Sequence, residues 1–341
     1  MANPQEPLLE IKNLKKYFPV QRGFLRRTLG FVKAVDDVNL EVRAGETLGI
    51  VGESGSGKTT LGRCVTRLYE PTGGKILMRD GNQVLSVTDL KGQELKGFRR
   101  MAQTIFQDPY SSLNPRMNVL QTVGEPLLVN NIARGNELEQ RVTETIVQVG
   151  LRVEHLQRYP HSFSGGQRQR IGIARALVLN PKVIVADEPV SALDVSIQAQ
   201  ILNLLLDLQQ KYQLTYLFIS HAMSVIRYVS DRIAVMYAGK LVELGSKKEL
   251  LITPKHPYTE TLLAAVPRTA QRRRGKRGVT PGEPPDLSNL PVGCVFIPRC
   301  KYAQEMCKTQ APELRMVGTG CWVSCHFAES LSLRGISGAA L

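Results

Sequence analysis

Three short apolar runs stand out along the chain, and each is followed directly by polar residues. Residues 47–51 read Thr-Leu-Gly-Ile-Val, residues 183–186 read Val-Ile-Val-Ala, and residues 216–219 read Tyr-Leu-Phe-Ile. Uninterrupted runs of this length are typical of strands buried on both faces of a parallel sheet. Helical patterns at residues 60–65, 137–147 and 171–179 lie between the first and second of these runs, so the chain is predicted to have an α/β fold.

The residues after the first run form a phosphate-binding loop. Residues 52–59 read Gly-Glu-Ser-Gly-Ser-Gly-Lys-Thr and match the pattern G-x-x-x-x-G-K-[ST], with a strand before it and a helix after it. Backbone N–H groups of such a loop bind phosphates at a helix N-terminus. A chance glycine-rich turn is the alternative, but motifs further along complete a nucleotide site. The candidate nucleotide-binding residues here are Gly52, Ser54, Gly55, Ser56, Gly57, Lys58, Thr59 and Thr60.

Two further motifs follow in the middle of the chain. Ser164, Gly165, Gly166 and Gln167 open the helical stretch 171–179, where they form either a second anion site or an N-cap with a flexible entry. The apolar run 183–186 ends at Asp187 and Glu188. Because ligands gather at the carboxyl ends of parallel strands, these two acids are candidate site residues.

With these motifs in this order, the chain resembles the ATP-binding cassette ATPases over roughly residues 8–265. The resemblance implies a RecA-like P-loop core, an antiparallel β subdomain and a helical signature subdomain at about residues 108–164. It also implies binding of ATP and Mg²⁺. Residue by residue it assigns Tyr17 to adenine stacking, Gln107 to the Q-loop, residues 164–167 to the signature, Asp187 to Walker B, Glu188 to the catalytic glutamate, Asp194 to the D-loop and His221 to the switch histidine.

Phosphoryl transfer explains why these residue types occur together. It is catalysed mainly by positioning and by charge stabilisation, which Lys58, Mg²⁺ and backbone amides supply. Thr59, Gln107 and Asp187 are the expected residues around the metal. Glu188 is expected to act as general base towards water, and His221 to contact the γ-phosphate. For the adenine, Phe18 lies next to Tyr17, and a surface aromatic residue is an equally simple explanation of Tyr17.

The helical arm predicts a site shared between subunits. About fifty residues separate Gln107 from Ser164, so the arm is expected to carry the signature away from its own phosphate loop. The resemblance then implies a head-to-tail dimer that encloses two nucleotides. Its expected partners are a second, distinct ATPase subunit, two transmembrane permease subunits and an extracytoplasmic substrate-binding protein.

The length and charge of the chain bear on its domain organisation, its location and its partners. With 341 residues the chain supports a large core and a second small domain, which we place at residues 266–341 after an ATPase domain at 1–265. No apolar run reaches 18 residues, so a peripheral location on the cytoplasmic face of the cell membrane is expected. The net charge of +14 invites a nucleic-acid function, but much of it lies at residues 22–33 and 272–277. Solvated linkers explain these stretches, with lipid headgroup contact as the alternative, and no nucleic-acid partner is expected.

The tail is rich in proline and holds five of the six cysteines, whereas Cys64 is expected in the core. Disulfides do not suit a reducing compartment, and the C-x-x-C pattern usual at structural zinc sites is absent. The tail resembles the C-terminal extension of dipeptide and oligopeptide importer ATPases. That resemblance implies a [4Fe-4S] cluster held by Cys294, Cys300, Cys307 and Cys325, with Cys321 in place of Cys325, or Zn²⁺ in place of the cluster, as alternatives.

The expected function is therefore ATP hydrolysis that powers the import of dipeptides or oligopeptides. Nickel-chelate and oligosaccharide uptake use the same ATPase type, and a soluble cassette ATPase acting on nucleic acid or ribosomes is a further alternative. One residue departs from the importer pattern: Ala222 follows His221, where an aspartate is usual. Because Ala222 is not expected to contact phosphate, activity should survive.

Overall fold

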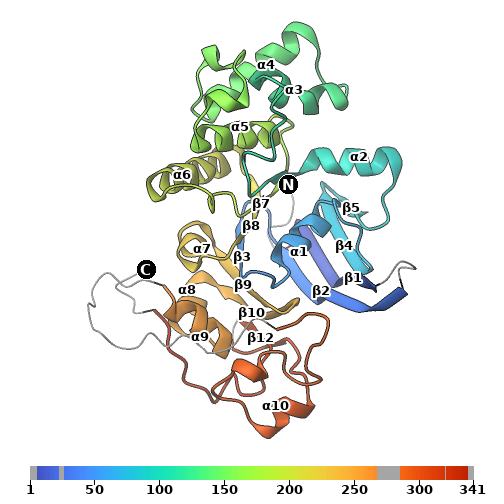
Figure 1. Cartoon of the computed structure of the whole chain (residues 1–341), viewed down its shortest axis with the longest axis vertical. Helices are drawn as coiled ribbons and strands as arrows, with labels where there is room; N and C mark the ends of the chain where they lie inside the picture. Colours follow the sequence, from blue (N-terminus) through green and yellow to red (C-terminus); the bar gives the residue numbers. More distant parts are fainter. Residues whose placement is uncertain (1–5, 23–26, 267–284, 319, 337–341) are drawn as a thin grey trace.

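The computed structural model describes residues 6–22, 27–266, 285–318 and 320–336. Its centre is an eight-stranded mixed sheet in the order β11-β12-β10-β9-β3-β8-β7-β6 (Figure 1). The strands are β3 (Thr47–Val51), β6 (Ala102–Ile105), β7 (Val183–Asp187), β8 (Thr215–Ser220), β9 (Arg232–Tyr237), β10 (Lys240–Ser246), β11 (Arg315–Met316) and β12 (Trp322–Val323).

The three apolar runs of the sequence form the neighbouring strands β3, β8 and β7. These pair in parallel with one another, and every residue of the three is buried. Side chains such as Leu48, Val185 and Leu217 are less than 2% exposed, which removes apolar surface from water on both faces of the sheet. The polar residues after these strands therefore meet at one edge of the sheet, as the sequence predicts.

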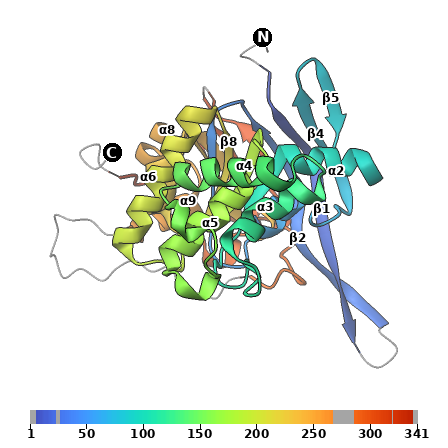
Figure 2. The ribbon, with the colours of Figure 1, turned by 90° about the horizontal axis from the view of Figure 1, so that it is seen from above.

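A second, antiparallel sheet of four strands lies beside the first, in the order β2-β1-β4-β5. Its long strands β1 (Leu9–Arg22) and β2 (Arg27–Val42) extend together beyond the rest of the molecule (Figure 2). Much of the basic stretch at residues 22–33 is therefore paired strand, so its interpretation as a linker is wrong. The other basic stretch, residues 272–277, lies outside the described residues. The remaining strands are β4 (Gly73–Asp80) and β5 (Gln83–Ser86).

The helical arm forms one end of the molecule (Figure 1). It contains α3 (Val119–Val129) and α4 (Gly135–Gln148), which pack against α5 (Gly165–Leu177) through buried residues such as Val123, Val142 and Ile171. The other helices are α1 (Lys58–Val65), α2 (Gly92–Met101), α6 (Val195–Tyr212), α7 (Met223–Val229), α8 (Lys247–Ile252), α9 (Pro257–Ala264) and α10 (Glu305–Thr309), with short 3₁₀ turns at η1 (Val153–His155), η2 (Pro160–Ser162) and η3 (Ile297–Arg299).

The cysteine-rich tail shares the core of the preceding part of the chain. Strand β12 pairs with β10 and so adds the tail to the large sheet. Phe296 is 1% exposed, and its ring packs against Tyr237 and Tyr258 with ring centroids 5.1 and 5.4 Å away. The tail is thus held by aromatic packing and sheet pairing with the preceding domain. Within the described ranges, no helix is long and apolar enough to cross a membrane.

Candidate nucleotide site

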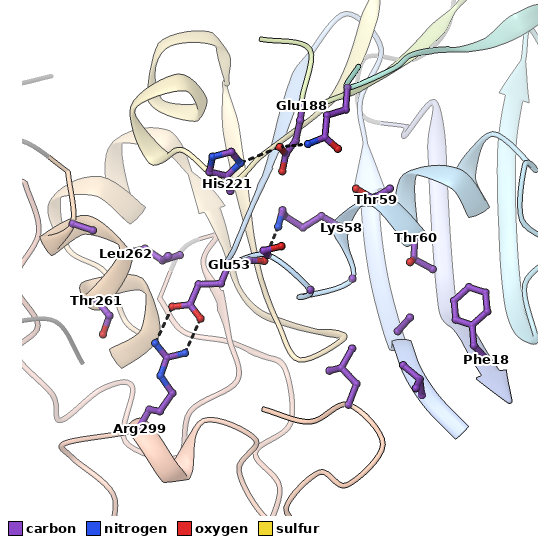
Figure 3. A pocket seen from close by; sticks show the side chains of 18 of the residues that line it. Phe18, Glu53, Lys58, Thr59, Thr60, Glu188, His221, Thr261, Leu262 and Arg299 are labelled. Atoms are coloured by element: carbon purple, nitrogen blue, oxygen red, sulfur yellow. Dashed lines mark hydrogen bonds and ion pairs between the residues drawn. The ribbon is translucent and has the colours of Figure 1, made fainter. Parts of the chain in front are cut away.

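A cavity of about 1010 Å³ opens at the edge of the sheet where β3, β7 and β8 end. Its wall contains most of the predicted phosphate loop together with residues that follow the neighbouring strands (Figure 3). Among the lining residues are the predicted site residues Ser54, Gly55, Gly57, Lys58, Thr59, Thr60, Gln107, Glu188 and His221. The structure therefore brings together residues separated by up to 167 positions (221 − 54) in the sequence.

The phosphate loop depends on glycine at Gly57. Its φ of +100° lies in the left-handed region, and a Cβ atom there would stand 2.0 Å from the carbonyl oxygen of Ala34. Lys58 begins helix α1, and its Nζ donates hydrogen bonds of 2.8 Å to the carbonyl oxygens of both Gly52 and Glu53. Burial lowers the pKa of Lys58, while the nearby carboxylates of Glu188, Asp187 and Glu53 act in the opposite direction.

Thr59 and Asp187 meet where a metal ion is expected. The Thr59 hydroxyl donates a 2.8 Å hydrogen bond to Oδ1 of Asp187. Asp187 is only 4% exposed, and burial raises its pKa, partly offset by the bond from Thr59. A buried carboxylate beside a hydroxyl is a donor set that suits Mg²⁺, since that ion prefers oxygen ligands. When bound, such an ion would supply positive charge to the phosphates of a nucleotide in the cavity.

Two side chains from different parts of the chain contact the carboxylate of Glu188. Nε2 of Gln107 donates to its Oε2 at 3.0 Å, and Nδ1 of His221 lies 3.0 Å from the same oxygen. Glu188 itself has φ +47°, a left-handed conformation that is costly for a residue other than glycine. Its backbone N–H is fixed by a 3.0 Å bond to the carbonyl of Ile219. The carboxylate is therefore held at a defined point in the cavity.

The adenine-stacking prediction for Tyr17 does not fit the geometry. Phe18, and not Tyr17, lines the cavity, on the side opposite Arg299 in Figure 3. The Tyr17 hydroxyl instead donates a hydrogen bond to the Asp36 carboxylate, because successive residues of a strand point to opposite faces. Phe18, weighed as the neighbouring aromatic, is the better candidate.

The signature and D-loop residues lie outside this cavity. Ser164 is the N-cap of helix α5 and forms a capping box with Gln167, which agrees with the N-cap alternative for this motif. Gly166 lies against the D-loop helix, where a Cβ would stand 2.5 Å from Cγ2 of Ile197. Asp194 occupies the N-cap position of α6. None of Ser164, Gly165, Gly166, Gln167 and Asp194 lines the cavity, so within one chain these residues are apart from the phosphate loop.

Sequence reasoning missed the contribution of the tail to the site. Leu287 and Arg299 both line the cavity, although they follow the predicted ATPase domain. Arg299 forms two hydrogen bonds with the carboxylate of Glu53 in the phosphate loop. A charged residue embedded between Cys294 and Cys300 was the only signal for this contact.

The four cysteines chosen as cluster ligands line one small cavity of about 20 Å³. Cys321 lies elsewhere, in a separate apolar cluster with Val317 and Val323. Burial raises the pKa of Cys294 and of Cys325 to about 11. Across the described part of the chain, no group of three or more His, Cys, Asp or Glu side chains is placed to hold a metal ion. The structure therefore gathers the four cysteines without forming a closed site for a single ion such as Zn²⁺. Cys64 is buried in the core, as expected.

Comparisons with known proteins agree with this geometry. Residues 35–191 match the family described as ABC transporter, and residues 242–307 match the oligopeptide/dipeptide transporter C-terminal region. The oligopeptide transport ATP-binding protein AppF of Bacillus subtilis is 51% identical, covering 95% of this chain and 98% of the relative. The dipeptide transport ATP-binding protein DppF of Escherichia coli is 46% identical, covering 95% of each chain.

Solved structures share the fold over a smaller part of the chain. A post-hydrolysis dimer of the ATP-binding cassette MJ0796, bound to ADP and Pi, is 30% identical with a TM-score of 0.60 and covers 70% of this chain and 98% of its own. CbiO1 of Clostridium perfringens is 26% identical, also with a TM-score of 0.60, over 72% of this chain and 91% of its own. The chain therefore belongs to the ABC transporter ATPases, within the group of oligopeptide and dipeptide transport ATP-binding proteins.

Proposed function

We propose that this chain hydrolyses ATP, with Mg²⁺, to power the import of dipeptides or oligopeptides through a membrane transporter. The observation that carries the proposal is near full-length similarity to peptide transport ATP-binding proteins, combined with a cavity lined by the phosphate loop and Glu188, where Thr59 bonds to Asp187. The match of residues 242–307 to the oligopeptide/dipeptide transporter region supports the peptide class. A soluble role on nucleic acid or ribosomes has no such support.

We propose the following roles for the residues of the site. The amides of the phosphate loop and Lys58 would bind the phosphates, and Thr59 and Asp187 would hold Mg²⁺, which would supply positive charge there. Glu188 accepts a proton from water as the water oxygen attacks the γ-phosphorus. Gln107 and His221, each about 3.0 Å from Oε2 of Glu188, orient that carboxylate and the water. The products are ADP and phosphate.

The second half of each site comes from another subunit in this proposal. Residues 164–167 and Asp194 lie outside the cavity, and the similar cassette MJ0796 forms a dimer. We propose a head-to-tail pair with a second, distinct ATPase subunit, beneath two permease subunits and an extracytoplasmic binding protein. The chain would then work on the cytoplasmic face of the membrane. Residues 1–265, with the arm at 108–164, would form the ATPase domain, and residues 266–341 an extension.

The extension is proposed to hold a [4Fe-4S] cluster. Support comes from the donor set: Cys294, Cys300, Cys307 and Cys325 face one cavity, and thiolates are the usual ligands of such clusters. A cubane has four irons, so its four thiolates are spread wider than those around one ion.

Uptake by cells tests the transported class. Deleting the gene for this chain should abolish uptake of a labelled dipeptide or oligopeptide, and the wild-type gene should restore it, whereas a gene with Glu188→Gln should not. Labelled nickel chelate and labelled oligosaccharide serve as parallel substrates. If the deletion abolished uptake of nickel chelate or of oligosaccharide and left peptide uptake unchanged, the affected substrate would take the place of peptide in the proposal.

A further inference from the structure

The phosphate loop contains an acid whose charge is unsuited to its surroundings. Glu53 is the second residue of the loop, and it lines the same cavity as Lys58. A carboxylate beside bound phosphates repels them, by an amount that grows as water is excluded. Nothing in the proposed catalytic steps uses this acid. Its charge must therefore be compensated within the protein.

Arg299 supplies that compensation. Its Nη1 donates to Oε2 of Glu53 at 2.6 Å and its Nη2 donates to Oε1 at 2.9 Å, a two-point pairing drawn in Figure 3. The Arg299 side chain is 8% exposed and that of Glu53 is 29% exposed, so solvent screens the pair only in part. An arginine guanidinium is always protonated in proteins, so Arg299 brings a full positive charge to the pair.

The backbone of Glu53 is also held by a residue from the C-terminal part of the chain. The backbone N–H of Glu53 donates a 2.8 Å hydrogen bond to the hydroxyl of Tyr258. Tyr258 lies in α9 and packs against Phe296, next to the turn that carries Arg299. The carboxylate and the amide of Glu53 are thus both fixed by residues beyond position 250.

Arg299 is in turn fixed by the stretch from Cys294 to Cys300, called here the cysteine-lined segment. It ends the 3₁₀ turn Ile297–Arg299, which begins three residues after Cys294 and ends just before Cys300. The backbone N–H of Ile297 bonds to the carbonyl of Cys294, and the N–H of Cys300 bonds to that of Ile297. The turn that carries Arg299 is therefore bonded at both ends to the backbone of the two cysteines.

We propose that Arg299 is a positioning residue for nucleotide binding: it neutralises Glu53 and holds the phosphate loop, so that affinity for ATP depends on the fold of the cysteine-lined segment. This inference rests on the proposed ATPase function. It assigns the tail a direct part in the nucleotide site.

Binding of a fluorescent ATP analogue to the purified full chain tests the charge argument. Arg299→Gln should weaken binding at least about tenfold, because an unpaired carboxylate then faces the phosphates. Glu53→Gln combined with Arg299→Gln should return affinity to within about threefold of wild type, since no charge is left to compensate. Lys308→Gln removes a cation from the same tail but from an exposed pair with Glu305, and it should bind as wild type does.

The outcomes separate this inference from the proposed function. If the wild type binds no nucleotide, the ATPase function fails. If the wild type binds but Arg299→Gln binds equally well, or if the double variant stays as weak as the single one, the neutralising role of Arg299 is wrong. Should Arg299→Gln fold poorly by circular dichroism, Arg299→Lys, which keeps the charge without the two-point geometry, should bind more tightly than the Gln variant.

The link to the cysteines has its own test in the same assay. Cys300→Ser should weaken nucleotide binding in the wild-type background, because it loosens the turn that carries Arg299. In the background of the double variant it should cause no further loss. An equal loss in both backgrounds would show that the cysteine segment acts on the site by a route other than Arg299.

Discussion

At the scale of single residues, Glu188 is the most constrained side chain of the site. It has a left-handed φ of +47°, and two side chains converge on one of its oxygens. Strain of this kind persists only where the surroundings hold it, and it occurs often at functional sites. The geometry therefore favours Glu188 as the base and Asp187, bonded to Thr59, as the metal ligand.

Replacing Glu188 by glutamine should slow ATP hydrolysis by about 10²–10⁴-fold with nucleotide binding retained, because only proton abstraction needs the carboxylate. Steady-state phosphate release and analogue binding measure the two effects. Glu305→Gln, which changes an exposed carboxylate of α10, is the matched control and should keep wild-type turnover. A Glu188→Gln chain with a wild-type rate would remove Glu188 from the mechanism.

Ala222 offers a residue-scale prediction about stability. It occupies the N-cap of α7 with an extended backbone, φ −93° and ψ 111°, and its side chain cannot cap the helix. Aspartate or asparagine there should add about 1 kcal/mol to the free energy of unfolding. Urea denaturation measures the gain, and equal gains for both variants would assign it to capping. No gain from either would show that α7 is satisfied without a cap.

Much of the residue-level site could be predicted from sequence because each motif has a fixed relation to a strand end. The choice between Tyr17 and Phe18 could not be predicted, because a one-residue change of register reverses which face a strand residue occupies. Arg299 was missed for a different reason. Its partner, Glu53, lies 246 positions earlier in the chain.

At the scale of elements, short uninterrupted apolar runs predicted the strands β3, β7 and β8 correctly, since burial on both faces requires such runs. The strands β11 and β12 have two residues each, too short for any periodic pattern. The paired stretch at residues 27–33 was taken for a linker because its basic residues hid the strand pattern. Pairing with β1 decides its conformation, and pairing is not visible in local sequence.

A buried pair at the join between β10 and α9 predicts a pH effect. Glu243 accepts hydrogen bonds from the backbone N–H groups of Lys255 and His256, and burial raises its pKa from 4.5 to about 7. Burial lowers the pKa of His256 from 6.5 to about 3. The Glu243 contribution to stability is lost as pH rises from about 4.5 to 7. That of His256 is lost as pH falls from about 6.5 to 3.

Between about pH 4.5 and 6.5 the Glu243 contribution to the free energy of unfolding falls as pH rises, while the His256 contribution increases. The two pH dependences therefore oppose each other in the wild type. Glu243→Gln should make the free energy of unfolding rise with pH in this window, relative to wild type, by up to about 1.4 kcal/mol per pH unit. His256→Gln should change the slope in the opposite direction. Urea denaturation at several pH values measures both, and parallel curves for all three proteins would contradict the assignment.

The proposed [4Fe-4S] cluster has a direct test in the purified chain. Protein purified without oxygen should carry about four irons per chain and absorb at about 400 nm. Cys300→Ser or Cys325→Ser should remove the absorbance, whereas Cys321→Ser should not, because Cys321 lies in a different cluster. Stoichiometric zinc without iron in such a preparation would overturn the cluster.

At the scale of the whole molecule, the residues of the proposed nucleotide site lie at two separate places in one chain. The phosphate loop, Glu188 and His221 share a cavity, while Ser164 and Asp194 belong to the helices α5 and α6 outside it. Arg299 ties the tail to the phosphate loop. ATP bound between two subunits would therefore contact elements from along most of the chain, which suits a molecule that converts hydrolysis into movement of its partners.

ATP hydrolysis by the complete transporter, reconstituted in vesicles with its permease and ATPase partners and its substrate-binding protein, tests the central claim most directly. Hydrolysis should rise when peptide is added on the side of the binding protein, and labelled peptide should accumulate on the side of this chain. Both should be lost with Glu188→Gln. Peptide accumulation that continues at the wild-type rate with Glu188→Gln, or hydrolysis that does not respond to peptide, would contradict the account.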